Sequence, residues 1–321
     1  AGHLRVTGTD TEITIRTNLD VEVLEEGRTV IPAKLAADAV RKLPAGAVSM
    51  SAVDGEVEIT GNGPRFRLRE LAVDDFPKLP ENPQSGGMAV DGRAFTAALA
   101  QVGVAASSDE ARPTLTGVLF ENESDTLRLV ATDSYRLAVR DIPGVSGASG
   151  TLVPYRALRE LGRTIGDEKM EISLGDREAS FSSSRGRLTV RIIEATFPNY
   201  RQLLPDEYPN RLIVKKEALL DAVGRASLVA EDHIPVRLNL HPGGIELSVT
   251  RQEVGEETEH IEGDYAGEEM TIAFNTRYLT DGINAVSEED VLLETIDPLK
   301  PGLLSGVESP EFRYLLMPVR L

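Results

Sequence analysis

Hydrophobic and polar side chains follow two different periods along this chain of 321 residues. In the stretches 90–107 and 214–231, hydrophobic side chains recur every three or four positions, which places them on one face of an α-helix. In the stretches 48–70 and 169–193, hydrophobic and polar positions alternate, and Gly-rich turns separate the runs, as in antiparallel strands. The pattern predicts an α+β chain with few helices and many strands.

The same landmarks return along the chain at intervals of about 120 residues, which indicates an internal repeat. The Phe-Pro step of FPKLP at 76–80 returns in FPNYRQLLP at 197–205, and Asp10 has a counterpart in Asp133. The first copy lacks the opening helix of the other two copies and the strands beside it, about 40 residues. The repeat predicts three domains, with the boundaries 1–82, 83–207 and 208–321.

Acidic side chains outnumber basic ones, since 34 Lys and Arg stand against 52 Asp and Glu and give a net charge of −18. The field of the whole molecule should therefore repel nucleic acid and acidic membranes. Five predicted helical segments are the exception, because together they carry eleven basic and six acidic side chains. A polyanion partner would have to meet this local basic surface. The segments are 33–43, 91–106, 155–163, 214–226 and 276–286.

The residue content argues against a catalytic or cofactor site. The chain has no Cys, its four His are scattered without ligand spacing, and no complete phosphate-binding loop or nucleophile elbow occurs. An alternative reading is a repeat-built, strand-rich enzyme or carbohydrate-binding protein with a site between copies. Such a site would need paired carboxylates, but Arg251 stands in the third copy where the first two have Asp10 and Asp133. We therefore expect no catalytic residue, cofactor or metal.

Five longer motifs carry a resemblance to a known family. They are RPTLTGVLF (112–120), ATDSYRLA (131–138), ATFPNYRQLLP (195–205), AFNTRYL (273–279) and YLLMPVRL (314–321). In this order, and spread over three repeats, they resemble the bacterial DNA polymerase III beta subunit, the sliding clamp. The resemblance covers the whole chain. It implies three tandem copies of a DNA-clamp fold, with antiparallel sheets outside and paired helices inside, the first copy being truncated at its N-terminus.

The resemblance also implies what the protein does. A clamp is a non-catalytic processivity factor, and two subunits joined head to tail form a ring around duplex DNA. It tethers the replicative DNA polymerase subunit, the clamp loader and other proteins with a clamp-binding motif through a peptide pocket. No membrane partner is expected, and the expected location is the cytoplasm, at the nucleoid. The side chains expected to face DNA are Lys34, Arg41, Lys42, Arg93, Arg112, Arg156, Arg159, Lys215, Lys216, Arg225 and Arg277.

The peptide pocket implied by the resemblance lies between the second and third domains. Its Leu, Met, Pro and Val side chains would give an adaptable apolar surface, and Arg136 and Arg320 could hold polar or carboxylate ends of a motif. The plainer reading of the ending LLMPVRL is a buried last strand. The expected lining is Leu115, Thr132, Ser134, Tyr135, Arg136, Leu137, Pro198, Leu203, Asn275, Tyr278, Leu299, Leu315, Met317, Pro318, Val319 and Arg320.

The segment PRFRLRE at 64–70 is expected to be an edge strand that pairs with a second subunit. Strict alternation puts three Arg on one face and two apolar side chains on the other. The acidic segment at 251–263 in the third copy is the expected partner, and head-to-tail pairing then closes by two-fold symmetry. The plainer reading is two solvated strands whose charges never meet. The expected interface residues are Arg65, Phe66, Arg67, Leu68, Arg69, Leu228, Glu256 and Glu257.

Overall fold

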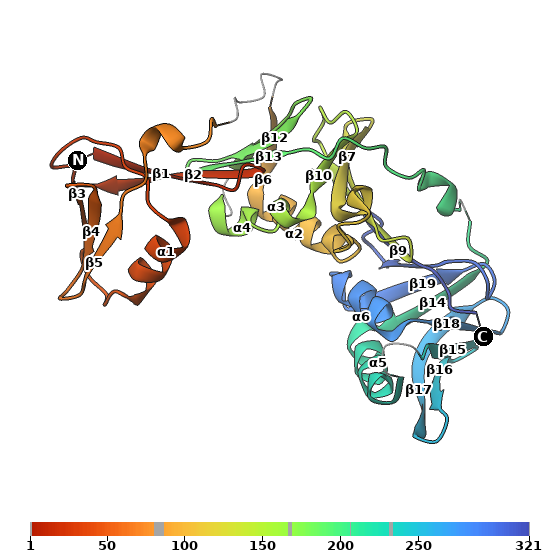
Figure 1. Cartoon of the computed structure of the whole chain (residues 1–321). Coiled ribbons are helices and arrows are strands. Elements are labelled where there is room, and N and C mark those ends of the chain that lie inside the picture. Colours follow the sequence, from red (N-terminus) through yellow and green to blue (C-terminus); the bar gives the residue numbers. More distant parts are fainter. Residues whose placement is uncertain (1, 80–86, 166–168, 206, 231–233, 321) are drawn as a thin grey trace.

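The chain folds into a crescent in which sheets form the convex side and helices line the concave side (Figure 1). The structure is a computed structural model, and it describes residues 2–79, 87–165, 169–205, 207–230 and 234–320. The N-terminal part lies at one end of the crescent and the C-terminal part at the other (Figure 1). The predicted boundary between residues 82 and 83 lies outside the described residues.

The N-terminal part has a single α-helix among its described residues. Its elements are β1 (Gly2–Thr9), β2 (Ile13–Val21), α1 (Ala33–Lys42), β3 (Ser49–Val53), β4 (Glu56–Thr60), β5 (Arg65–Arg69) and the 3-10 turn η1 (Val73–Asp75). Helix α1 begins after Pro32 and buries only Ala39. The described part of this copy thus has no counterpart of the helix that opens the other two, as the repeat predicts.

The central part opens with a strand and a long helix. Its elements are β6 (Met88–Asp91), α2 (Gly92–Gly103), η2 (Pro113–Thr116), β7 (Gly117–Glu123), β8 (Thr126–Thr132), β9 (Arg136–Pro143), β10 (Thr151–Pro154), α3 (Tyr155–Leu158), α4 (Leu161–Thr164), β11 (Lys169–Leu174), β12 (Glu178–Ser182), β13 (Gly186–Arg191) and η3 (Arg201–Leu203). The Asp91 carboxylate caps α2 by accepting from the Ala94 amide at 2.8 Å. Phe95, Leu99 and Val102 are buried, so the predicted apolar face of this helix is confirmed.

The C-terminal part repeats this order with two well-packed helices. Its elements are β14 (Asn210–Lys215), α5 (Lys216–Ala230), β15 (Val236–His241), β16 (Gly244–Arg251), β17 (Gly255–Ala266), β18 (Met270–Phe274), α6 (Thr276–Ala285), β19 (Asp290–Thr295), β20 (Gly302–Gly306) and β21 (Phe312–Leu316). Leu219, Val223 and Ala226 of α5 are buried, which confirms the predicted apolar face.

The sheets run across the borders between repeats. A six-stranded sheet has the order β1-β2-β13-β12-β11-β6, and a twelve-stranded sheet has the order β10-β7-β8-β9-β21-β20-β19-β14-β17-β16-β15-β18. Strand β2 pairs antiparallel with β13, and β9 pairs antiparallel with β21. Neighbouring repeats are therefore joined by backbone hydrogen bonds, and each junction has the geometry of a sheet interior.

The main core lies between these sheets and the helices of the concave side. In the central part, the rings of Phe95, Phe120 and Phe181 pack with centroids 6.0 to 6.2 Å apart. Such tilted and offset arrangements are the favoured aromatic contacts. The same cluster continues into the C-terminal part through Leu219 and Phe274. The N-terminal part has a separate, smaller cluster made of three buried side chains, Val57, Ile59 and Leu68.

The helix predicted at 155–163 is shorter than expected and splits into two single turns, α3 and α4. Between them the Glu160 amide donates to the carbonyl of Ala157, three residues back, instead of continuing the four-residue pattern. This 3-10 bond tightens the chain and ends α3 at Leu158. The apolar spacing of Leu158 and Leu161 still buries both side chains, so the face was predicted correctly although the helix is broken.

Candidate functional site

The turn between β8 and β9 is held by a network around Asp133. Ser134 has a positive φ of 81°, a conformation that few residues other than Gly adopt without support. The Asp133 carboxylate supplies that support, since it accepts from the amides of Tyr135 at 2.9 Å and Arg136 at 3.1 Å. The Thr132 hydroxyl donates to the Arg136 carbonyl at 2.7 Å and closes the turn. The turn therefore presents Tyr135 in a fixed position.

Arg136 lies buried at the centre of a charged cluster. Its Nε donates to Asp133 at 2.9 Å, and one of its terminal nitrogens donates to Asp281 at 2.5 Å and to the Tyr314 hydroxyl at 3.3 Å. Burial by itself lowers the pKa of Arg136, but Tyr314, Asp281 and Asp133 outweigh it and the pKa is raised overall. Burial also raises the pKa of Tyr314. Arg136 thus joins the turn to helix α6 and strand β21.

Two tyrosine rings stack beside this cluster. The rings of Tyr135 and Tyr278 have centroids 6.1 Å apart at an angle of 26°, and the Arg136 guanidinium lies over the Tyr278 ring at 4.4 Å. Tyr278 is placed by the start of α6, where the Asn275 side chain caps the helix by accepting from the Tyr278 amide at 3.1 Å. Tyr135 is 56% exposed, which is high for a ring of this size.

The end of the chain runs along the same place. Strand β21 pairs with β9, and beyond it the Met317 amide donates to the Tyr135 carbonyl at 2.9 Å. The Val319 amide then donates to the Ala273 carbonyl at 2.8 Å. The backbone of this tail is tied down while the Met317 and Val319 side chains are exposed. We call Tyr135, Tyr278, Met317 and Val319 the tyrosine surface.

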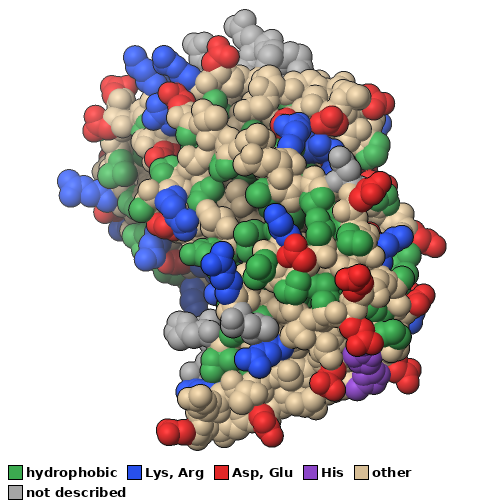
Figure 2. All heavy atoms as spheres, turned by 90° about the vertical axis from the view of Figure 1, so that its right-hand side faces the viewer, with side chains coloured by type: hydrophobic (Ala, Val, Ile, Leu, Met, Phe, Trp, Pro, Cys, Tyr) green, Lys and Arg blue, Asp and Glu red, His purple; other side chains and the backbone are tan. Residues whose placement is uncertain are grey.

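The other residues expected in the pocket fall into two groups. Leu115, Thr132, Leu137 and Leu315 are buried, and Leu137 and Leu315 belong to a core cluster that also contains Tyr200. The exposed or partly exposed residues are Ser134, Pro198, Leu203, Asn275, Leu299, Pro318 and Arg320. Figure 2 views the right-hand side of Figure 1 and shows hydrophobic side chains across the middle of this face among charged ones. The plainer reading of the last strand therefore holds up to Leu316, and only the tail after it is exposed.

Ten of the eleven side chains expected to face DNA are exposed, and Lys216 is half-buried. Lys216 donates to the carbonyls of Asn284 and Val286, and burial lowers its pKa. Five of the exposed ones have acidic partners: Arg41 with Asp38, Arg112 with Asp109, Arg156 with Glu12, Lys215 with Asp290, and Arg225 with Glu259. The others are Lys34, Lys42, Arg93, Arg159 and Arg277, of which Arg93 also has an interaction within the chain. The basic surface is thus sparser than the count of charges suggests.

The two strands expected to pair between subunits both have an open edge among the described strands. Strand β5 pairs with β4 alone, its three Arg are exposed, and Phe66 and Leu68 turn inward, so the predicted alternation is confirmed. Arg65 and Arg67 lie 3.5 and 3.2 Å from Glu58 of β4. Strand β17 pairs with β16 over 255–262, whereas β14 reaches only 263–266.

The side chains beside the open part of β17 are unusual. Leu228 at the end of α5 is 82% exposed. The Glu257 Oε2 atom is shielded from solvent without a hydrogen-bond partner among the described residues. Burial, helped by the charge of Glu259, raises the pKa of Glu257. Leu228 thus exposes an apolar side chain, and Glu257 keeps one shielded oxygen without a donor among the described residues.

Family models of the DNA polymerase III beta subunit match the chain in three consecutive pieces. The N-terminal domain matches residues 1–80, the central domain residues 89–199 and the C-terminal domain residues 201–320. The chain belongs to the DNA polymerase III beta subunit family. Members of this family are the beta sliding clamps, so the expected fold of three clamp domains is confirmed.

Individual relatives are similar to this chain over nearly its whole length. The beta sliding clamp of Streptomyces coelicolor is 33% identical over 338 residues, covering 100% of this chain and 89% of the relative. That of Caulobacter vibrioides is 32% identical over 326 residues, covering 95% and 88%. Among solved structures, the Caulobacter crescentus beta sliding clamp has a TM-score of 0.92 at 31% identity, covering 99% and 88%. A Pseudomonas aeruginosa sliding clamp bound to griselimycin has a TM-score of 0.93 at 26% identity, covering 99% and 89%.

Membership of the family confirms the predicted activity. The chain is a sliding clamp, a non-catalytic processivity factor of DNA replication that binds DNA, the polymerase and proteins with clamp-binding motifs, and that forms dimers. The alternative of a repeat-built enzyme is thereby excluded. In the part of the chain that the structure describes, no three His, Asp or Glu side chains gather as metal ligands, and no helix has the length and apolarity to cross a bilayer.

The sequence did not mark three residues that hold Arg136 beside the tyrosine surface: Asp133, Asp281 and Tyr314. Asp133 had a local signal, since an Asp that opens a turn commonly accepts from amides two and three residues on. Asp281 had none, because it meets Arg136 from 145 residues away. Tyr314 lies in an apolar strand. From the sequence, a Tyr that only packs in the core looks the same as a Tyr whose hydroxyl also hydrogen-bonds a buried Arg.

Proposed function

We propose that this clamp captures the peptide motifs of its partners on the tyrosine surface and the exposed residues around it. The observation that carries the proposal is the combination of a rigid backbone with exposed apolar side chains. The Asp133 network and the two backbone bonds of the tail fix the frame, so few atoms need ordering when a peptide binds. The Tyr and Met side chains then offer amphipathic and adaptable contact area.

Within this proposal Arg136 acts by positioning rather than by touching the peptide. Its donors are directed at Asp133, Asp281 and Tyr314, and its guanidinium supports the Tyr278 ring. Arg320 is exposed and remains the candidate for a carboxylate of the motif. Leu115, Leu137 and Leu315 would form the floor below the tyrosine surface.

Fluorescence polarisation with a labelled apolar clamp-binding peptide tests the proposal. Tyr135→Ala should weaken binding by about tenfold, as expected for an aromatic contact worth 1 to 2 kcal/mol. The matched control is Tyr265→Phe, a ring on β17 in the third copy that should leave the affinity unchanged. Equal affinity of the Tyr135→Ala protein and the parent would place the peptide elsewhere.

For DNA, we propose that Lys34, Lys42, Arg93, Arg159 and Arg277 make the first contacts with phosphates. All five are exposed on helices of the concave side or at their ends (Figure 1). Few contacts of this kind give an attraction that is independent of sequence and sensitive to salt. After loading, the clamp should stay on closed circular DNA and slip off linear DNA. Lys34→Glu with Lys42→Glu should shorten the stay on circles, while equal retention on both DNA forms would refute a ring.

For ring closure, we propose that β5 of one subunit pairs with the open part of β17 in the next. Exposed ion pairs are worth about 0 to 1 kcal/mol each, so backbone pairing and Leu228 must supply most of the affinity. Arg67→Glu with Arg69→Glu should yield monomers, and adding Glu256→Arg with Glu257→Arg should partly restore dimers. Sedimentation at low and high salt decides this, and an unchanged association constant of the first variant would rule the interface out.

We also propose where the domains of the clamp begin and end and where in the cell it works. The domain borders at 82/83 and 207/208 follow the repeat, and the sheet crossings suit domains that do not move freely against one another. As a replication protein, the clamp is proposed to work in the cytoplasm at the nucleoid. Fluorescence microscopy of the tagged protein in dividing cells tests this, and a signal spread evenly away from the DNA would contradict it.

A further inference from the structure

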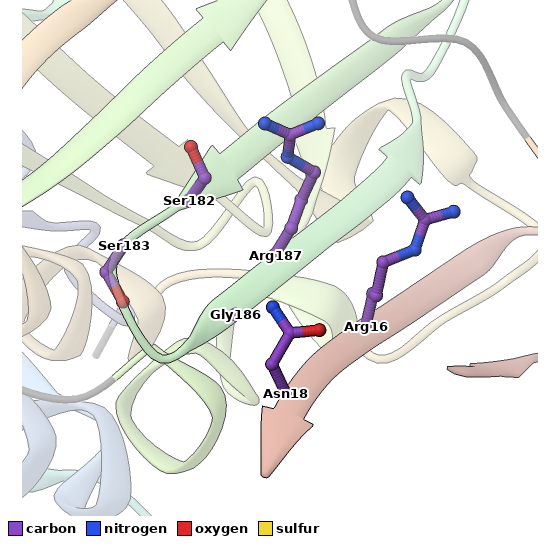
Figure 3. Close-up of a pocket in the computed structure, with 6 residues that line it drawn as sticks. All are labelled: Arg16, Asn18, Ser182, Ser183, Gly186 and Arg187. Atoms are coloured by element: carbon purple, nitrogen blue, oxygen red, sulfur yellow. The ribbon is translucent and has the colours of Figure 1, made fainter. Parts of the chain in front are cut away.

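Two arginines face each other where the N-terminal and central parts join. Arg16 of β2 and Arg187 of β13 are direct partners in the antiparallel pairing of these strands. Figure 3 shows both side chains standing on the same face of the sheet. Like charges directly opposite each other on neighbouring strands are destabilising. The pairing therefore brings two positive charges to one place on the sheet.

The pair lies on the face of the sheet that turns away from the helices. Its neighbours along the strands, Ile15 and Leu188, pack in the main core that α2 shares. Because side chains alternate along a strand, Arg16 and Arg187 point the opposite way. They are therefore separate from the helical surface proposed to face DNA and from the tyrosine surface.

Arg16 has an unsatisfied donor at this place. Its Nε is shielded from solvent and has no hydrogen-bond partner among the residues that the structure describes. A shielded N–H of a charged group without an acceptor is costly, and such groups in native structures call for a missing partner. Arg187 does have another interaction in the chain, so the argument rests on Arg16 and on the position of the second charge.

Both arginines line a cavity of about 150 Å³, and Figure 3 shows them with the four other residues that line it. Its lining is Arg16, Asn18, Ser182, Ser183, Gly186 and Arg187, and it contains no carboxylate. Gly186 is needed for the close approach of the strands, since a side chain there would collide with the backbone of Arg16. A volume of this size accommodates a five-atom oxyanion, since one water molecule occupies ~30 Å³ in the liquid.

We propose that this cavity is a binding site for a phosphate group. Two guanidinium groups from different strands, with the Ser182 hydroxyl and the Asn18 amide beside them, offer donors from several directions, as a tetrahedral oxyanion needs. A planar carboxylate would fill fewer of these positions. Neither the clamp activity nor the proposed partner surfaces use this site, so the inference stands independently of them.

A phosphate held here would join two parts of the molecule. Arg16 lies in the piece matched by the N-terminal domain model, and Arg187 in the piece matched by the central domain model. One anion between them would replace a repulsion across the β2–β13 pairing by two attractions. The bound form should therefore hold this junction more firmly than the free form.

The test follows the arginine Nε–H signals by NMR in protein with labelled arginine, while inorganic phosphate replaces chloride at constant ionic strength. The Arg16 signal is assigned by its loss in Arg16→Lys, and the Arg187 signal by its loss in Arg187→Lys. Both signals should shift along one saturable curve. Arg16→Gln, read through the Arg187 signal, should weaken binding by about tenfold, the effect of one charge-assisted hydrogen bond.

Arg191→Gln is the matched control, because Arg191 lies on the same strand outside this cavity and should leave binding unchanged. Phosphoserine distinguishes two sources of the bound phosphate. If phosphoserine binds as tightly as inorganic phosphate, the site takes phosphate groups carried on larger ligands. If inorganic phosphate alone binds, the site takes the free ion. Either result supports the proposal. An Arg16 signal that does not saturate, equal binding of acetate, or unchanged binding by Arg16→Gln would overturn it.

Discussion

Replacing Gly282 by Ala should destabilise the clamp, although Ala is the better helix former. Gly282 lies inside α6, and a Cβ there would collide with the ring of Tyr314 and stand 3.0 Å from a methyl group of Leu304. Tyr314 and Leu304 are both fully buried, so neither can move into solvent. The added methyl group must therefore push the Tyr314 ring or the helix.

Two opposing effects set the size of the change. Replacing Gly by Ala inside a helix gains about 1 kcal/mol, and forcing a methyl group into a packed core costs about 1 to 3 kcal/mol. The Tyr314 hydroxyl also donates to the Tyr278 carbonyl at 2.9 Å and accepts from Arg136. Loss of these bonds adds about 1 kcal/mol each. The net result is a destabilisation of about 2 to 4 kcal/mol, or a fall in the melting temperature of roughly 4 to 16 °C.

Gly224→Ala is the matched control, because Gly224 lies in α5 and a Cβ there meets nothing within 4 Å. This change should raise the melting temperature by up to roughly 4 °C. Calorimetry of the parent and both variants measures the shifts, and peptide affinity should fall for Gly282→Ala alone. If Gly282→Ala melts at or above the parent temperature, the packing argument for Tyr314 is wrong.

Three further changes should have distinct outcomes. Deleting 317–321 should abolish peptide binding and leave the circular dichroism spectrum nearly unchanged, because β21 ends before the deletion. Asp141→Asn should destabilise the protein by about 3 kcal/mol in urea unfolding, because Arg128 and Arg313 both bind this partly buried carboxylate; a change below 1 kcal/mol would contradict this. Burial raises the pKa of Glu178 above 4.5, so this group favours folding below pH 4.5 and loses that contribution as pH rises through its raised pKa. Glu178→Gln should therefore gain melting temperature at neutral pH and not at acid pH.

Much of the fold could be predicted from the sequence because its signals are local. The three- and four-residue spacing around Phe95 and Leu219 specified buried helix faces, and the alternation in β5 specified which side chains face inward. The break between α3 and α4 could not be predicted, since the same apolar spacing fits a continuous helix and a 3-10 step. Strand pairing across the repeats was also hidden, because β9 and β21 meet from far apart in the sequence.

The candidate site was less predictable for the same reason. The sequence marked Tyr135, Tyr278 and Met317 as residues that resemble a peptide pocket, but it gave Arg136 the role of a ligand contact. The structure surrounds Arg136 with Asp133, Asp281 and Tyr314, from three separate elements. A basic side chain in a motif shows only that charge is needed there. An arginine at such a position can contact a bound peptide or stabilise the protein's own turn. Which of the two it does depends on nearby carboxylates from distant parts of the chain, and sequence spacing does not reveal these.

Both junctions between repeats carry more than backbone pairing. At β9–β21 the Arg136 cluster and the tyrosine surface draw on residues of the second and third copies, so the surface exists only while these copies are joined. At β2–β13 two arginines face each other beside the cavity proposed to bind phosphate. The first junction is held in part by charges within the chain, whereas an anion from solution would add to the backbone pairing of the second. Phosphate bound in that cavity should therefore make the β2–β13 junction harder to separate.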